Sequence, residues 1–274
     1  MVALRRLGTP VYVGYRSLTA SGAHAPVFIN SIPKAGTHLL SSMIGRVPGL
    51  SFSGRVIVHD AYSAQPARSV GEVPAYEVGD LAKAIGAVRR GTYANSHLYF
   101  DETTSELLTG FGRRSVFVVR DPRDILVSQL DYIEAFPGHP LHRHLTLAYR
   151  TRADRLMALI SGWPPGDGYR GLVNVADRLD RYLGWLSVLP TFRFEEFASA
   201  PSEQSLQDSL VRLSESLGLN VDSEAQRLRG GIGDRWSPTM SSGRSSRWLE
   251  EFNGDHLEMI SSVAGDQIAS LGYN

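Results

Sequence analysis

A lysine in a chain that hardly uses lysine points to anion chemistry. Only Lys34 and Lys83 are lysines among 28 basic residues, and Lys34 lies in Val27–Leu40, which reads VFINSIPKAGTHLL. An apolar run, a Pro-Lys-Ala-Gly-Thr turn and a helical pattern predict a strand, a turn and a helix. Amides that open a helix lack intrahelical partners. The turn therefore predicts a phosphate site, with close backbone approach at Gly36, a hydroxyl at Thr37 and a point charge at Lys34.

A second strand, turn and helix follows further along the chain. Ser115–Arg120 reads SVFVVR, the most strand-like run in the sequence, and it passes into DPRDILVSQLDYIEAF. In that stretch Asp121 suits the N-cap, Pro122 the first helical position and Asp124 the positive end of the helix.

The first turn lacks the GxxxxGK[ST] spacing of a Walker A loop, which disfavours a magnesium-dependent kinase.

The first turn resembles a loop of a known family. SIPKAGTHLL is similar to the 5′-phosphosulfate loop, PKSGTTW, of the sulfotransferases, which use 3′-phosphoadenosine 5′-phosphosulfate (PAPS). Lys34, Gly36 and Thr37 match, whereas Ala35, His38 and Leu39 stand where Ser, Thr and Trp are common. The resemblance implies that Lys34, Ala35, Gly36, Thr37 and His38 hold the 5′-phosphosulfate, and that Lys34 also steadies the leaving oxygen.

The second turn resembles the family's other signature, an arginine at a strand end and a serine eight positions on. Arg120 and Ser128 have that spacing, and the resemblance implies that both bind the nucleotide's 3′-phosphate. With a helix beginning near Asp121, Ser128 lies about two turns along, so one anion could contact both side chains. The structural alternative is that Arg120 forms an ion pair with Asp121, Asp124 or a distant acid, and that Ser128 is a surface position on the helix.

Two later segments resemble the family less closely. FRFEEF at Phe192–Phe197 is similar to its YED segment, with Phe194 in place of the tyrosine and without its hydroxyl. TMSSGRSSRW is similar to the TFRKGxxGDW loop that covers the cofactor. Thr239, Gly243 and Trp248 match in it, while Ser241 and Ser242 replace Arg and Lys. We hypothesise that Arg244 or Arg247 supplies the missing positive charge to the 3′-phosphate.

A general base is expected at His97. YANSHLYF resembles the family's KTHLP segment, in which the histidine accepts the proton of the acceptor hydroxyl. Histidine suits this role because its pKa is near neutral pH. A structural histidine at a strand end is the alternative. His59 and Asp60 remain rival bases, since a carboxylate serves in some relatives.

A histidine cluster, GHPLHRH, carries His139, His142 and His144. Its spacing differs from the His pair and glutamate of a zinc helix. We therefore expect a solvent-facing loop there, and the resemblance implies a reaction without metal.

Composition limits the class of protein. The chain has 274 residues, 42% of them hydrophobic, a net charge of zero and no cysteine. A balanced charge offers no bulk field for nucleic acid or an anionic membrane, and disulfides, thiolate nucleophiles and iron–sulfur clusters are excluded. No apolar run reaches the roughly 18 residues of a membrane span, and no signal peptide is evident. We expect a soluble, cytoplasmic protein.

Strand-like and helix-like segments alternate, which predicts an α/β fold. We expect three α/β/α layers around a mainly parallel sheet, similar to P-loop NTPases, with an N-terminal extension at 1–26 and a single sulfotransferase-like domain at 27–274. Further expected elements are strands at Thr92–Asn95 and Pro190–Phe194 and helices at Thr37–Arg46, Ala148–Ile160, Leu172–Leu189, Ser202–Leu217 and Asp255–Leu271. The long loop Gly230–Trp248 is a candidate lid.

The expected reaction moves a sulfuryl group from PAPS to an acceptor hydroxyl and releases 3′-phosphoadenosine 5′-phosphate (PAP). The motif variant PKxGTHLL favours a glycan or glycolipid acceptor over a small phenol. A P-loop-type small-molecule kinase and an inactive nucleotide-binding module are the alternatives. The segments Ser51–Ala94 and Leu141–Gly171, where acceptor specificity would lie, carry no recognisable signature, and the oligomeric state stays open.

Overall fold

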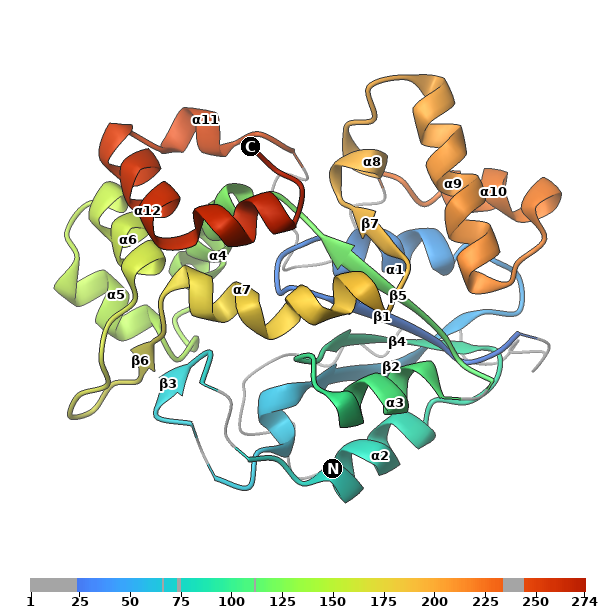
Figure 1. The fold of residues 1–274 in the computed structure, drawn as a ribbon, viewed down its shortest axis with the longest axis horizontal. Helices are drawn as coiled ribbons and strands as arrows, with labels where there is room; N and C mark the ends of the chain where they lie inside the picture. The colour runs from blue at the N-terminus through green and yellow to red at the C-terminus, as the bar shows by residue number, and fades with distance from the viewer. Residues whose placement is uncertain (1–23, 66, 73–74, 111, 234–243) are drawn as a thin grey trace.

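The structure is a computed structural model that describes residues 24–65, 67–72, 75–110, 112–233 and 244–274. Within these residues, five parallel strands form a sheet in the order β2-β4-β1-β5-β7. Figure 1 shows the strands side by side through the middle of the molecule. Their bounds are β1 Val27–Ser31, β2 Ser51–Val58, β4 Thr92–His97, β5 Arg114–Val119 and β7 Thr191–Arg193.

The sheet is covered on both faces, so its central strand is buried along its whole length. All five residues of β1 are buried. Val27 and Ile29 contribute to one hydrophobic core and Phe28, between them, to the other, because successive side chains of a strand point to opposite faces. This is the three-layer α/β/α arrangement with a parallel sheet that the alternating pattern predicts, and the prediction is confirmed.

Four helices pack into the core that contains Val27 and Ile29. They are α1 Thr37–Ile44, α8 Glu195–Ala198, α9 Glu203–Leu217 and α10 Val221–Arg229.

The larger core contains Phe28 and Phe117, together with residues of the other longer helices in the described part of the chain. These are α2 Val78–Gly86, α3 Glu102–Thr109, α4 Pro122–Ala135, α5 His142–Ala148, α6 Arg152–Ser161, α7 Val175–Leu183 and α12 Gly254–Ser270. Shorter elements complete this side: the helices η2 His59–Tyr62, η3 Gly184–Ser187 and α11 Trp248–Glu251, and the paired strands β3 Ser69–Val70 and β6 Gly171–Leu172.

Two predicted helices have different bounds in the structure. The helix expected at Leu172–Leu189 is divided, because its first residue belongs to β6, Asn174 caps α7 and Gly184 ends it. The helix expected from Ala148 begins only at Arg152, where the Thr151 side chain accepts a hydrogen bond from the Asp154 amide in a capping box. In both cases a polar N-cap residue sets the start of the helix.

The central strands bring the candidate site together. β1 pairs with β4 on one side and with β5 on the other, all in parallel. The turns that follow these three strands therefore meet at one edge of the sheet, which is where α/β proteins bind ligands.

In the described part of the chain, no helix has both the length and the apolar character needed to cross a bilayer. The division into an extension and one domain stays a prediction, because residues 1–23 are not described.

Candidate functional site

The turn after β1 is built to receive an anion. The Ala35 amide donates to the Ile32 carbonyl at 3.0 Å, and both Lys34 (φ 72°) and Gly36 (φ 115°) adopt the left-handed conformation. Gly36 is the N-cap of α1, and glycine has no side chain to accept hydrogen bonds from the first-turn amides. Alternating conformations of this kind form a concave set of backbone N–H donors, so the geometry of the turn is suited to an anion.

Phe194 connects this turn with the second one. A Cβ atom at Gly36 would lie 2.7 Å from Cδ2 of Phe194, so the close packing and the positive φ both require glycine. The guanidinium carbon of Arg120 lies 4.4 Å from the centroid of the same ring. Phe194 is buried, and it has the position of a packing residue between the two turns.

Lys34 has a perturbed ammonium group. Its Nζ atom lies 4.4 Å from the centroid of the Tyr132 ring, and its side chain is half-buried. Burial and the charge of Arg120 lower the pKa of Lys34 to about 8, although Asp131 acts in the opposite direction. A cation–π contact stabilises an ammonium that has lost part of its hydration. Lys34 thus remains mostly protonated at neutral pH while it is held at the site.

His97 is oriented by a hydrogen-bond network that reaches the first turn. Its Nδ1 lies 2.9 Å from the Ser31 carbonyl oxygen and 3.2 Å from the Ser31 hydroxyl. Because a carbonyl only accepts, Nδ1 carries the proton and Nε2 bears the lone pair. Burial, opposed by the Ser31 hydrogen bond and reinforced by Lys34, lowers the pKa of His97. The Ser31 hydroxyl also lies 2.5 Å from that of Thr37, which ties the histidine to the start of α1.

Arg120 reaches across from the second turn to the first. Its Nη1 donates to the Lys34 carbonyl at 3.5 Å and its Nη2 to the Arg244 carbonyl at 2.7 Å. Nη2 also lies 3.5 Å from the Asp124 carboxylate. The two motifs that the sequence singled out therefore meet at one place. Ser128 is buried on α4, and His38 is exposed on the first turn of α1.

The segment before α11 is anchored to the second turn by Asp124. This fully buried carboxylate accepts from the Ser246 amide at 2.7 Å and from the Trp248 amide at 3.1 Å. The Arg123 guanidinium lies 3.9 Å from the Trp248 ring centroid. Sequence reasoning assigned Asp124 to the helix dipole and to an ion pair with Arg120, but it missed this anchor, because the two amides are more than 100 positions away.

The two arginines proposed for the missing positive charge differ in position. Arg247 donates to Asp131 at 2.6 Å and also pairs with Glu251, so its charge is engaged between helices. Arg244 is exposed and pairs with Glu250 on the surface, while its carbonyl receives Arg120. Of the two, Arg244 is the one whose backbone contacts the second turn. Thr239 and Gly243, and most of the candidate lid, lie outside the described residues.

The two rival bases, His59 and Asp60, differ in how accessible they are to an acceptor. The ring of His59 is 1% exposed and packs between Tyr99 and Tyr76, at centroid distances of 4.7 and 4.4 Å. Such enclosure leaves no approach for an acceptor. Asp60 is half-buried, and burial raises its pKa while Tyr99 and Arg170 act in the opposite direction.

The prediction of a solvent-facing loop at the histidine cluster is wrong. His142 and His144 lie on α5, and all three histidines are half-buried, because the apolar Leu141 and Leu145 of the same stretch are packed in the core. The His142 ring makes a 2.7 Å hydrogen bond with the Ile133 carbonyl, and the His144 ring stacks on Tyr169. Among the described residues, no three His, Asp or Glu side chains are grouped as metal ligands.

Comparison with known proteins defines the class of fold. No family profile matches the chain, and no curated sequence is detectably similar to it. Solved structures are similar. Mouse sulfotransferase SULT7A1 complexed with PAP has a TM-score of 0.57 at 16% identity, over 91% of this chain and 89% of that one.

Retinol dehydratase is a second structural neighbour. Its complex with androsterone and the inactive cofactor PAP has a TM-score of 0.53 at 15% identity, covering 89% of this chain and 80% of that one. The complex of retinol dehydratase with retinol and PAP has the same TM-score at 14% identity, over 89% and 81%. The chain therefore has the sulfotransferase fold, in agreement with the resemblance found in its two phosphate motifs.

Proposed function

We propose that the protein is a PAPS-dependent sulfotransferase that moves a sulfuryl group to an acceptor hydroxyl and releases PAP. The observation that carries this proposal is the convergence of three side chains at the carboxyl ends of adjacent strands. His97 ends β4, Lys34 follows β1 and Arg120 follows β5. These side chains supply a base, a charge for a leaving oxygen and a charge for a distant phosphate, which are the needs of group transfer from a nucleotide.

The roles of the residues follow from their chemistry. Nε2 of His97 accepts the proton of the acceptor hydroxyl as its oxygen bonds to sulfur. The bond between sulfur and the bridging phosphate oxygen breaks, and the Lys34 ammonium stabilises the charge left on that oxygen. The amides of Gly36, Thr37 and His38 bind the 5′ end of the nucleotide, and Ala35, whose amide donates to the Ile32 carbonyl, keeps the turn in shape beneath it. Arg120 and Ser128, with Arg244, Thr239 and Gly243, bind its 3′-phosphate side, and Phe194 packs beneath Arg120.

A glycan or glycolipid is the acceptor that we favour, and polar groups near His97 support it. Val58, the last residue of β2, pairs with His97, so η2 begins next to the base. In η2, Asp60 Oδ1 is buried without a hydrogen-bond partner in the described part of the chain, as is Arg170 Nε.

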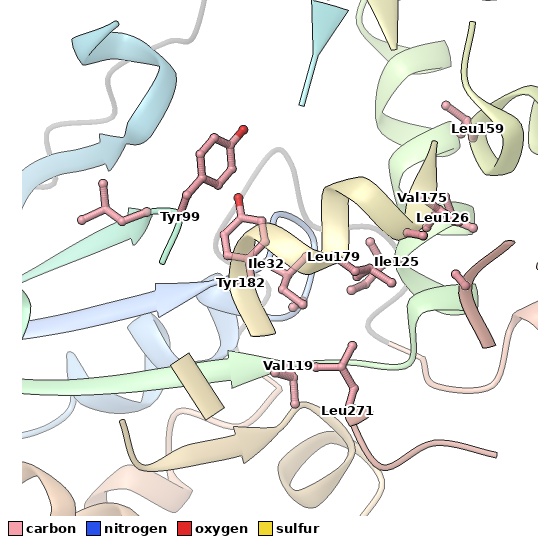
Figure 2. Close-up of a cluster of buried hydrophobic side chains, with 14 of the residues drawn as sticks. Ile32, Tyr99, Val119, Ile125, Leu126, Leu159, Val175, Leu179, Tyr182 and Leu271 are labelled. Carbon is pink, nitrogen blue, oxygen red and sulfur yellow. The ribbon is translucent and has the colours of Figure 1, made fainter. Parts of the chain in front are cut away.

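Figure 2 shows the hydroxyls of Tyr99 and Tyr182 directed to the same side. Burial, followed by Asp60, raises the pKa of Tyr99, so this hydroxyl stays protonated. A ligand with several hydroxyls both donates and accepts hydrogen bonds, and would suit a site bordered by polar groups of this kind. We also propose that the protein acts in the cytoplasm, as expected from the sequence.

Calorimetric titration with PAP and with magnesium-ATP tests the function. We expect PAP to bind, and AMP, which lacks the 3′-phosphate, to bind more weakly. Transfer of ³⁵S from labelled PAPS to a panel of methyl glycosides, alcohols and phenols tests turnover. Selective ATP binding would favour the kinase, and PAP binding without any labelled product would favour the inactive module.

A further inference from the structure

His139 is separated from the proposed leaving-group lysine by one tyrosine ring. It lies in the turn between α4 and α5, where its amide donates to the Phe136 carbonyl at 2.9 Å and its carbonyl accepts from the His142 amide at 2.9 Å. Its ring packs edge-to-face with Tyr132, with 5.5 Å between the ring centroids. The same Tyr132 ring carries the Lys34 ammonium at 4.4 Å. One tyrosine therefore contacts both the proposed leaving-group lysine and His139.

The tautomer of His139 follows from its backbone partner. The Leu141 amide donates to Nδ1 of His139 at 3.2 Å, so Nδ1 bears the lone pair and, in the neutral ring, the proton is on Nε2. Burial, with smaller contributions from His142, Lys34 and Arg170, lowers the pKa of His139 to about 4. At neutral pH the ring is uncharged and presents Nε2–H as a hydrogen-bond donor.

His139 and His97 thus have opposite tautomers. His97 donates through Nδ1 to the Ser31 carbonyl and keeps a lone pair on Nε2, whereas His139 accepts at Nδ1 and keeps a hydrogen on Nε2. The charge of Lys34 contributes to the lowered pKa of both rings. The proton of an acceptor hydroxyl can therefore go to His97, while His139 can only donate.

We propose that His139 positions the acceptor, by donating its Nε2–H to an oxygen next to the reacting hydroxyl, so that the site selects a vicinal diol or another hydroxyl-rich acceptor such as a glycoside. This inference rests on the proposed sulfotransferase function. An apolar alcohol has no second oxygen for this donor. A sugar ring has one on the neighbouring carbon, and a matched donor at a buried site discriminates strongly against ligands that lack the partner.

Two substitutions of His139 distinguish the effect of its hydrogen-bond donor from the effect of its packing. His139→Asn keeps a side-chain oxygen that can accept from the Leu141 amide, but it removes the donor at the ε position. His139→Gln places an amide N–H near the lost Nε2–H. We expect His139→Asn to raise the glycoside KM by about 10-fold or more, whereas His139→Gln recovers most of the loss. His144→Phe is the matched control, because it changes a histidine of the same segment that stacks on Tyr169.

The measurements are the PAP Kd, the KM and kcat for methyl glycosides and for 1-octanol, and the hydrolysis of PAPS without acceptor. The proposal expects an unchanged PAP Kd, unchanged hydrolysis and unchanged octanol kinetics in His139→Asn, with only the glycoside KM raised. Loss of hydrolysis with an unchanged glycoside KM would overturn it, as would wild-type transfer to octanol but to no glycoside. Failure of the wild type to bind PAP would instead overturn the proposed function.

Discussion

The turns after β1 and β5 share a strand-turn-helix plan but present different donors. The first has two left-handed residues and a glycine N-cap, so it offers backbone amides and one lysine. The second is already satisfied internally, since the Asp121 carboxylate accepts from the Arg123 amide at 2.9 Å and pairs with its guanidinium at 2.8 Å. It offers side chains instead. The same local motif therefore serves two purposes. Where the N-cap is glycine, the first-turn amides stay open to an anion, and where it is aspartate, the cap accepts from the Arg123 amide and the donors come from side chains.

This difference between the turns separates residues that would act in the reaction from residues that would bind the nucleotide. Lys34 and the His97 network belong to the first turn, where bonds are made and broken in the proposed reaction. Arg120 and the Asp124 anchor belong to the second, where the nucleotide would be held at a distance from the reacting atoms. Variants of Lys34 and His97 should lower turnover and largely spare PAP affinity, and variants of Arg120 should do the reverse.

The largest effect is expected at His97. His97→Ala removes the general base and should lower kcat by about 10²- to 10⁴-fold, with PAP affinity unchanged. His97→Asn is the matched control, because its amide N–H can still donate to the Ser31 carbonyl. Steady-state transfer kinetics and calorimetry measure the two quantities. Retained turnover in either variant would remove His97 from the mechanism.

The pH dependence tests Lys34. Because the pKa of Lys34 is lowered to about 8, its charge is present below that pH and is lost above it, so turnover should fall roughly tenfold per pH unit on the alkaline side. The acid side should fall only below the ordinary histidine value, since the pKa of His97 is lowered.

In Lys34→Arg the guanidinium stays charged, so the alkaline fall should disappear even though the rate is lower. A pH–rate profile of kcat measures both limbs. An identical alkaline limb in this variant would assign the titration to another group.

Arg120 should control affinity. Arg120→Ala removes a charged donor from the proposed 3′-phosphate site and should weaken PAP binding by about 10- to 100-fold. Binding of AMP should change little, because AMP has no 3′-phosphate. The ratio of the two Kd values, measured by calorimetry, corrects for any general loosening of the turn. An equal loss for both nucleotides would contradict the assignment.

The smallest effect is expected at Arg244. Its guanidinium is exposed and paired with Glu250, so Arg244→Ala should weaken PAP binding only about 3-fold, as is usual for exposed charges. Arg247→Ala should instead lower the melting temperature, because Arg247 pairs with Asp131 and Glu251 between helices. Unchanged PAP affinity in Arg244→Ala would exclude Arg244 from the 3′-phosphate site.

Much of this protein could be predicted from local sequence. Hydrophobic periodicity predicts the alternating strands and helices, because the spacing of the residues on one face differs between a strand and a helix. The Gly36 turn and the Asp121-Pro122 helix start are likewise local, because caps act over three or four residues. The confirmed α/β/α fold and the positions of both phosphate motifs follow from these signals.

Contacts between distant segments could not be predicted in this way. The hydrogen bond that fixes the His97 tautomer joins residues 66 positions apart, and the Asp124 anchor spans more than 120. The sequence also misplaced the histidine cluster, whose half-buried rings depend on α5 packing against its neighbours.

The amino-acid sequence by itself determined the elements and the residue types at their ends, because those depend on forces between near neighbours along the chain. Only the tertiary structure decided which nitrogen of His97 or His139 bears the hydrogen, what lowers the pKa of Lys34 and which later arginine has its backbone against Arg120. These properties depend on groups that burial and parallel strand pairing bring within a few ångströms, and no local pattern records them.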